Sequence, residues 1–301
     1  MRLAIVTCAT ANWIPWAAVT LLSCVENGKT QDADLLICVH GASAKDRLDL
    51  QQFNASHDLK IRLIDVDATT IDKSKLRKWG VGAVMRLKLD HYLDSSFDRV
   101  LYLDSDILVL APLHRLLQTE LGDCIAAAVP DIGFMAFARP KKSRRIKALG
   151  FERQGEYFNS GVILFNWPET LHQGILGQTL AVLEARDDLR SPDQDALNLV
   201  MKHRWKAVDY RWNVASIERK YLKLDPFIVH FTGRKPWTAS RGSRDTAYFH
   251  YYDAVLRNSP WPDFVSRQRT FTAVIQDWMD FLLPWIRFRR RWQLRNYLGL
   301  N

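Results

Sequence analysis

Residues 99–106 read Arg-Val-Leu-Tyr-Leu-Asp-Ser-Asp, a short apolar segment that ends in two carboxylates spaced two residues apart. A continuous apolar run of this length predicts a strand covered on both faces, as in a parallel sheet packed between helices. On extended backbone, residues i and i+2 point to the same side, so Asp104 and Asp106 are expected to share one face. Two neighbouring carboxylates require a counter-charge, which Mg²⁺ or Mn²⁺ would supply. A solvated turn is the alternative.

Similar apolar runs recur on both sides of this segment and alternate with stretches at helical spacing. That alternation predicts βαβ units and an α/β fold with a parallel sheet. In such sheets, ligands bind beyond the carboxyl ends of the strands. The expected strands cover residues 3–7, 35–39, 59–66, 99–103, 124–129 and 162–165, with a further strand ending at 230. The expected helices cover 15–23, 44–53, 83–93 and 173–185.

The composition is that of a globular protein. Of the 301 residues, 48% are apolar and 25% are charged, which excludes disordered, collagen-like and coiled-coil architectures. The four cysteines have no CxxC spacing, so we expect reduced, buried thiols in the cytosol rather than a disulfide scaffold or a sequence-local zinc site. Residues 3–25 carry no charge, but Asn12 and Pro15 interrupt them. A buried strand and helix therefore fit better than a signal peptide or membrane span.

A second polar segment lies far along the chain, where residues 228–237 read Ile-Val-His-Phe-Thr-Gly-Arg-Lys-Pro-Trp. An imidazole from His230 beside two carboxylates would make a mixed oxygen and nitrogen site that suits Mn²⁺. Gly233 would let the backbone approach a ligand, and Arg234 or Lys235 would hold a diphosphate. The alternative is a structural histidine at a strand end.

Three further segments combine polar residues with an expected element. Asn159-Ser-Gly161 precedes the strand at 162–165, and the alternative for it is an ordinary turn. Residues 191–198, Ser-Pro-Asp-Gln-Asp-Ala-Leu-Asn, predict a helix start in which the acids need do no more than cap the helix. Arg86 lies on the expected helix before the paired carboxylates, and a surface charge is its alternative.

Together and in this order, these segments resemble glycosyltransferase family 8, which includes glycogenin and the bacterial lipopolysaccharide α-galactosyl- and α-glucosyltransferases. The resemblance runs from about residue 3 to residue 237. It implies a GT-A fold, that is, a Rossmann-like nucleotide-sugar-binding fold with a mostly parallel central sheet. It also implies a UDP-sugar donor, Mn²⁺ with Mg²⁺ as the other candidate, and retention of the α-anomeric configuration. The matching segments are 86–89, 101–106, 158–162, 193–198 and 230–237.

The resemblance also implies roles for individual residues. The metal ligands would be Asp104, Asp106 and His230, with Ser105 between the carboxylates. The nucleotide and diphosphate would contact Thr7, Asn12, Gly233 and Lys235. The donor sugar would lie among Arg86, Asp131, Asn159, Asp193 and Gln194, with Gln194 at the β-face of the anomeric carbon. Since Lys235 is the fifth residue after His230, where the family pattern has the sixth, Arg234 and Lys235 are both candidates for the diphosphate.

The C-terminal segment is basic and aromatic. Residues 281–301 hold five arginines and no acid, in a chain of net charge +9. Aromatic residues recur every three or four positions between the arginines, which favours an amphipathic helix on an anionic membrane surface, with a bend at Pro284. A helix packed on the catalytic domain is the alternative, and no nucleic-acid fold is visible. We therefore predict a catalytic domain at 1–262 and a membrane-associating helical tail at 263–301.

The predicted function is transfer of a hexose, with galactose or glucose favoured, from a UDP-sugar to a glycan or glycolipid such as lipopolysaccharide core. The enzyme would lie in the cytoplasm, on the inner face of the cytoplasmic membrane. Residues 134–137 and the basic cluster at 141–147 would contact the acceptor. One alternative is a Mg²⁺ phosphatase of the haloacid-dehalogenase type, although here the paired carboxylates follow the fourth strand. The other is a non-catalytic membrane- or glycan-binding protein.

Overall fold

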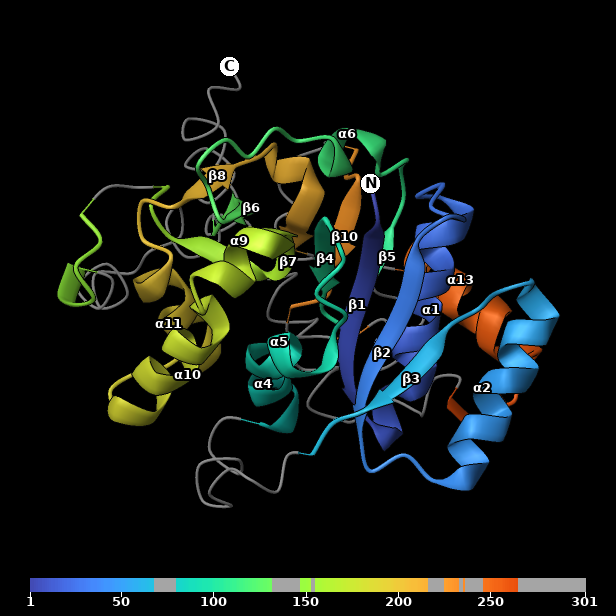
Figure 1. Cartoon of the computed structure of the whole chain (residues 1–301). Helices are drawn as coiled ribbons and strands as arrows, with labels where there is room; N and C mark the ends of the chain where they lie inside the picture. The colour runs from blue at the N-terminus through green and yellow to red at the C-terminus, as the bar shows by residue number, and fades with distance from the viewer. Residues whose placement is uncertain are drawn as a thin grey trace, which may run out of the picture.

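The computed structural model describes residues 1–67, 80–131, 147–152, 155–215, 225–232, 235 and 246–264. Their main feature is a seven-stranded sheet with helices on both faces (Figure 1). The strand order is β3-β2-β1-β4-β7-β6-β8. These strands are β1 (Leu3–Thr10), β2 (Asp34–His40), β3 (Arg62–Asp65), β4 (Arg99–Leu103), β6 (Ala126–Pro130), β7 (Phe158–Asn166) and β8 (Trp205–Ala207).

One strand runs against all the others. β7 pairs antiparallel with both β4 and β6, whereas the remaining pairs in this sheet are parallel. The mostly parallel sheet expected from the sequence is therefore confirmed. The apolar run at 162–165 did not predict the reversal, because an apolar pattern does not distinguish an antiparallel strand from a parallel one. The reversal places the first residues of β7 beside the carboxyl end of β4, where Asp104 follows.

Two separate cores cover the two faces of the sheet. Along β1, Ile5 and Ala9 belong to one core, while Ala4 and Val6 belong to the other, as the alternation of side chains on a strand requires. The first core includes residues of α1 (Ile14–Glu26), α2 (Ala44–His57) and α13 (Thr246–Arg257). The second includes residues of α9 (Trp167–His172), α10 (Ile175–Ala185) and α11 (Pro192–Val200). Figure 1 shows the two groups of helices on opposite sides of the strands.

The helix expected at 83–93 is not continuous. It divides into α4 (Val81–Met85), the 3₁₀ turn η2 (Arg86–Lys88) and α5 (Leu89–Tyr92). The backbone of Lys88 leaves helical values, at φ −121° and ψ 13°. A regular helix cannot bury Met85, Leu87 and Leu89 on one face, and the interruption lets all three reach the core. The helix expected at 173–185 begins at Ile175, after Gly174 in the left-handed conformation.

A small second sheet lies beyond the carboxyl end of β4. It consists of β5 (Ile107–Val109), β10 (Ile228–His230) and β9 (Val214–Ala215), in the order β5-β10-β9. β10 is antiparallel to β5, with His230 opposite Ile107. The strand end predicted at 230 is thus confirmed, whereas β5 was not expected. The remaining short elements are α6 (His114–Leu117), η1 (Ala11–Trp13), η3 (Tyr210–Asn213) and η5 (Pro262–Phe264).

Helix α1 holds the chain that links the two sheets. Thr20 Oγ1 donates to the carbonyls of Ser105 (3.2 Å) and Ile107 (2.9 Å). Ser23 Oγ accepts from the Val109 amide at 3.0 Å. A buried polar backbone group without a partner is costly, so these side chains fix the turn that carries Asp106.

The last described residues pack on the same core. The Trp16 and Phe264 rings lie 5.6 Å apart between centroids, and those of Phe53 and Trp261 lie 5.2 Å apart. Residues 265–301 lie outside the described residues, so the predicted domain boundary and helical tail stay predictions. No helix in the described part combines the length and apolar character needed to cross a membrane.

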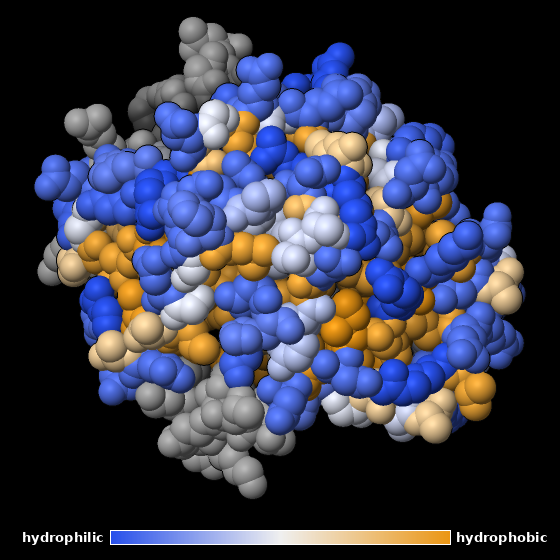
Figure 2. All heavy atoms as spheres, viewed as in Figure 1, coloured by the Kyte–Doolittle hydropathy of each residue, from blue (hydrophilic) through white to orange (hydrophobic). Residues whose placement is uncertain are grey.

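Few large apolar side chains are exposed in the described part of the chain. On the face drawn in Figure 2, apolar residues show in separate areas between polar ones. Among described residues, only Met1 and Leu48 are large apolar residues that are mostly exposed. The four cysteines form no disulfide. Cys8, Cys24 and Cys38 are buried, as expected, whereas Cys124 is only half-buried.

Replacing Thr20 by Val should destabilise the fold by about 1–3 kcal/mol, because the Ser105 carbonyl loses its hydrogen bond at unchanged side-chain size. Urea unfolding measures the difference. Thr179→Val is the matched control, since the Thr179 hydroxyl is equally buried but, among the described residues, bonds only to the carbonyl of Ile175, one turn earlier in its own helix. Equal unfolding free energies for Thr20→Val and the wild type would contradict this role.

Candidate active site

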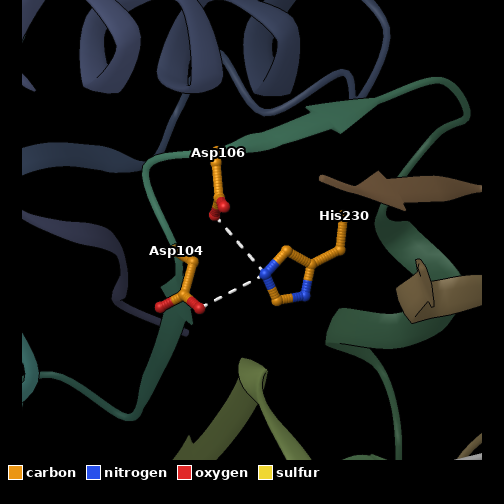
Figure 3. A group of neighbouring side chains, drawn as sticks. All are labelled: Asp104, Asp106 and His230. Carbon is orange, nitrogen blue, oxygen red and sulfur yellow. Dashed lines mark ion pairs between the residues drawn. The ribbon is translucent and has the colours of Figure 1, made fainter. Parts of the chain in front are cut away.

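Three predicted metal ligands meet between the two sheets (Figure 3). Asp104 follows β4, Asp106 precedes β5 and His230 ends β10. His230 Nε2 lies 3.4 Å from Asp104 Oδ2 and 3.4 Å from Asp106 Oδ1. One ligand atom from each residue lies within 4.8 Å of the other two. Two carboxylates and an imidazole suit a divalent cation such as Mn²⁺, so the donor set fits the expected metal.

Neighbouring charges keep both carboxylates ionised. Burial alone would raise the pKa of Asp104, but the charge of Arg86 and a hydrogen bond from His230 bring it below its ordinary value. Burial opposes ionisation of Asp106 too, but the charge and hydrogen bond of His230 together with the charge of Lys235 outweigh it, so this pKa is also lowered. For His230, burial lowers the pKa, while Asp106 and then Asp104 raise it to a net value of about 9. His230 and each carboxylate therefore stabilise one another's charged forms, while the two carboxylates repel each other.

Arg86 connects the carboxylates to the start of β7. Its Nη2 donates to Asp104 Oδ1 at 2.7 Å, and its Nη1 donates to the carbonyl and hydroxyl oxygens of Ser160, both at 3.1 Å. Its Nε forms an ion pair with Asp193 Oδ2 at 3.2 Å, and its guanidinium lies 4.7 Å from the centre of the Tyr102 ring. The side chain is only 11% exposed. Arg86 is therefore a buried member of the site and not a solvated surface charge.

Gln194 is held by four hydrogen bonds at the other end of the same network. Its Nε2 donates to Asp131 Oδ2 (3.0 Å) and to the Tyr157 hydroxyl (3.1 Å). Its Oε1 accepts from the Ser160 amide (3.1 Å) and from the Ser160 hydroxyl (3.4 Å). A continuous chain of contacts thus runs from Asp131 through Gln194 and Ser160 to Arg86.

The other residues of the 191–198 segment join α11 to β7. Asn198 exchanges hydrogen bonds with the Phe158 amide (2.7 Å) and carbonyl (2.9 Å). Asp195 is fully buried and accepts from the Arg190 and Ser191 amides and from the Tyr157 hydroxyl. Burial raises the pKa of Asp193, and the charge of Arg86 only partly offsets this. One acid therefore caps the helix, while another faces the site.

The remaining predicted residues take different positions. Lys235 Nζ forms an ion pair with Asp106 Oδ2 and donates to the Phe231 carbonyl. Thr7 is fully buried in β1, and its Oγ1 has no hydrogen-bond partner in the described part of the chain. Asn12 is exposed in η1, just after β1, and Ser105 contributes its carbonyl to Thr20. Gly233 and Arg234, and the acceptor segment expected at 134–137, lie outside the described residues.

Sequence reasoning missed two residues that touch His230. Asn213 Oδ1 lies 3.0 Å from His230 Nδ1, and no local pattern marked it. Gly161 packs against the ring, since an added Cβ would lie 2.2 Å from His230 Cε1 and 3.0 Å from Asp104 Oδ2. A glycine inside an apolar strand pattern is a known sign of close approach, and this sign could have identified Gly161.

Comparison with known proteins points to one family. The family model described as Glycosyl transferase family 8 matches residues 4–241. General stress protein A of Bacillus subtilis is 26% identical over 85% of this chain and 94% of its own length. A lipopolysaccharide 1,2-glucosyltransferase of Escherichia coli is 28% identical over 83% of this chain and 76% of its own.

Solved structures agree on the fold. The galactosyltransferase LgtC, in complex with donor and acceptor sugar analogues, superposes with a TM-score of 0.68 at 24% identity, over 85% of this chain and 96% of that one. The bifunctional glycosyltransferase WbbM gives a TM-score of 0.72 at 23% identity, over 88% of this chain and 51% of that one. The expected GT-A fold is confirmed by these likenesses.

Replacing Gly161 by Ala should weaken Mn²⁺ binding by about tenfold or more, because the new methyl group displaces the ring that presents Nε2. The overpacking should also cost about 1–3 kcal/mol of stability. Electron paramagnetic resonance of free Mn²⁺ during titration measures the affinity. Gly177→Ala is the control, since a Cβ there meets nothing within 4 Å. Unchanged Mn²⁺ affinity in Gly161→Ala would contradict the close packing.

Proposed function

Because this chain belongs to glycosyl transferase family 8, we propose that it is a retaining hexosyltransferase that uses a UDP-sugar. The hexose would pass to a hydroxyl group of a glycan or glycolipid. The convergence of Asp104, Asp106 and His230 at the carboxyl end of β4 carries this proposal. Glucose and galactose are the favoured sugars, because related enzymes include lipopolysaccharide glucosyltransferases and a lipopolysaccharide 1,3-galactosyltransferase of Salmonella typhimurium, 28% identical over 62% of this chain.

The donor's diphosphate would lie against the three metal ligands. A divalent cation held there, with Mn²⁺ favoured over Mg²⁺, would bind the diphosphate and stabilise the charge on UDP as it leaves. Lys235 supports this placement, because its ammonium group already lies beside Asp106 and can reach an anion next to the same carboxylate. Gly233 and Arg234 would complete the phosphate contacts, while Thr7 and Asn12 would contact the nucleotide.

The hexose would lie over the hydrogen-bonded chain between β7 and α11. Four of the expected sugar-contacting residues belong to that chain: Arg86, Asp131, Asp193 and Gln194. Asn159 precedes Ser160 in β7. Hydrogen bonds among these side chains leave them little rotational freedom, so they present a fixed polar surface to the sugar hydroxyls. Fixed donors and acceptors of this kind favour one orientation of a hexose over others.

We propose that the acceptor attacks on the same face from which UDP leaves. An amide is a poor nucleophile, and the four hydrogen bonds of Gln194 hold its oxygen toward Ser160. The bond from the anomeric carbon to the donor phosphate oxygen breaks, and the bond to the acceptor oxygen forms. The hydroxyl proton passes to the departing phosphate. The enzyme's part is to orient both reactants and stabilise the leaving charge.

The acceptor and location remain parts of the proposal. Lipopolysaccharide core or a related cell-surface glycan fits the names of several relatives. An enzyme that uses UDP-sugars for such a glycolipid would work in the cytoplasm, on the inner face of the cytoplasmic membrane. The basic, aromatic residues 278–295 would hold it on the anionic surface, and the basic cluster at 141–147 would contact a phosphorylated or acidic acceptor.

Incubation with a panel of UDP-sugars should release UDP from one of them in the presence of Mn²⁺ and not with EDTA. Asp104→Asn should reduce this turnover by about 100-fold or more, because it removes a ligand charge where charge develops. Asp32→Asn is the matched control, since Asp32 is exposed in the turn before β2, at the amino end of that strand, whereas the site lies at the carboxyl end of β4. Equilibrium binding of UDP is measured in parallel. A wild-type chain that binds no UDP in the presence of Mn²⁺ would contradict the proposal.

Gln194→Ala tests same-face attack. The proposal expects a loss of about 100-fold or less in turnover, since the change removes orientation and no bond-forming atom. Loss of a nucleophile costs about 10⁶-fold in a well-studied hydrolase. Gln178→Ala, at an exposed position of α10, is the control. A loss of about 10⁶-fold in Gln194→Ala, or a hexose covalently attached to the wild-type chain in mass spectrometry, would favour double displacement.

A further inference from the structure

Both ring nitrogens of His230 lie close to polar side chains. Its Nε2 faces Asp104 and Asp106, while Nδ1 points away from both carboxylates (Figure 3). Nδ1 lies 3.0 Å from Oδ1 of Asn213, a buried residue at the end of η3. Asn213 Nδ2 in turn lies 2.8 Å from Asn159 Oδ1, which also accepts from the Gly161 amide at 3.0 Å.

The direction of every bond in this relay follows from its backbone end. The Gly161 N–H can only donate, so the atom of Asn159 that faces it must be an oxygen. That oxygen cannot donate to Asn213, so the atom of Asn213 that faces it must be the NH₂ nitrogen. The other terminal atom of Asn213 is then the carbonyl oxygen, and it faces His230 Nδ1. An amide oxygen only accepts, so Nδ1 must carry a hydrogen.

This assignment determines which nitrogen is available to a metal. Without a metal the ring is positively charged and carries a hydrogen on both nitrogens. When a cation displaces one of them, Nδ1 keeps the hydrogen that Asn213 accepts, and the lone pair is on Nε2. Nε2 is the nitrogen that lies 3.4 Å from each carboxylate. With the opposite tautomer, two acceptors would face each other at Nδ1, and a hydrogen would stand where the cation binds.

We propose that Asn213 is a positioning residue that fixes the ring orientation and the Nδ1–H form of His230, so that Nε2 presents its lone pair to the divalent cation. The relay from Gly161 through Asn159 fixes Asn213 in turn. Gly161 contributes twice, because its amide sets the direction of the relay and its missing side chain makes room for His230 Cε1. The inference rests on the proposed function for the identity of what Nε2 binds.

Two substitutions distinguish the hydrogen-bond acceptor of Asn213 from the volume that its side chain fills. Asn213→Leu keeps the size of the side chain but offers no acceptor to Nδ1–H. Asn213→Asp keeps that acceptor, although its second oxygen then opposes Asn159 Oδ1. Groups that orient a metal-binding histidine typically account for about 10- to 100-fold in metal affinity. We expect Asn213→Leu to lose about that much Mn²⁺ affinity, and Asn213→Asp to stay within about tenfold of the wild type.

Mn²⁺ alone is the probe, and free Mn²⁺ is followed by electron paramagnetic resonance in titrations of the full chain. Asn54→Leu is the matched control. Asn54 likewise bonds through both amide atoms, to the Ile61 amide and carbonyl, but it lies in α2, away from the metal ligands. Its loss should lower stability without changing Mn²⁺ affinity.

Nuclear magnetic resonance of the chain labelled with ¹⁵N-histidine gives a second readout that needs no metal. The wild type and Asn213→Asp should show an Nδ1–H signal of His230 that is protected from exchange with water. The signal is assigned by its absence in His230→Gln, and in Asn213→Leu the protection should be lost. If Asn213→Leu does not fold, the wild type and Asn213→Asp still decide the outcome.

Each result points to one conclusion. Wild-type Mn²⁺ affinity in Asn213→Leu, or equal loss in Asn213→Leu and Asn213→Asp, overturns the inference. Absence of a protected Nδ1–H in the wild type overturns it as well. A wild-type chain that binds no Mn²⁺ overturns the proposed function together with the purpose assigned to Asn213, and is thereby distinguished from failure of the inference alone.

Discussion

The constraint on which the structure depends is the mutual repulsion of two largely buried carboxylates. Asp104 and Asp106 lie two residues apart at the end of a buried strand, where like charges repel strongly and burial favours their neutral forms. Three cations offset this: Arg86 at Asp104, Lys235 at Asp106, and His230 between them. They come from two separate parts of the chain, since His230 and Lys235 are only five residues apart. The fold must therefore bring η2 to β10 and the nearby Lys235.

The sheet topology meets this requirement in two steps. The reversed strand β7 continues its ladder past β4, since the Asp104 amide donates to the Gly161 carbonyl at 2.9 Å. That pairing places Ser160 within hydrogen-bond distance of Arg86, and it packs Gly161 against His230. The β5 and β10 pair then brings His230 to Asp106, and the Phe231 amide donates to the Asp106 carbonyl at 3.0 Å. Each contact uses backbone hydrogen bonds that the strands form in any case.

Local patterns predicted six strands of the main sheet, the paired carboxylates and the histidine at the end of β10, but not the short strands β5, β8 and β9. Asp104 and Asp106 were visible because apolar strands followed by acids are unusual, and His230 because cations and a glycine follow it within a few residues. Asn213 was invisible, because its role depends on the register of β9 and β10, which no stretch of sequence around residue 213 encodes. The interruption of the helix at 81–92 was missed because it also depends on tertiary packing. Burial of both Leu87 and Leu89 is not compatible with a regular helix, and the sequence pattern alone did not predict that both are buried.

The segment 191–198 shows why one motif can admit both a structural and a functional interpretation. Gln194 and Asn198 are four residues apart on α11, so both face β7, where Asn198 bonds to the Phe158 backbone. Those hydrogen bonds fix the position of α11 relative to β7, and they thereby hold Gln194 against Ser160. Asp195 caps the helix start, which leaves Asp193 to face Arg86. Asp195 and Asn198, the structural residues of the segment, therefore make the polar surface of the site rigid. Helix capping and function are complementary roles of neighbouring side chains.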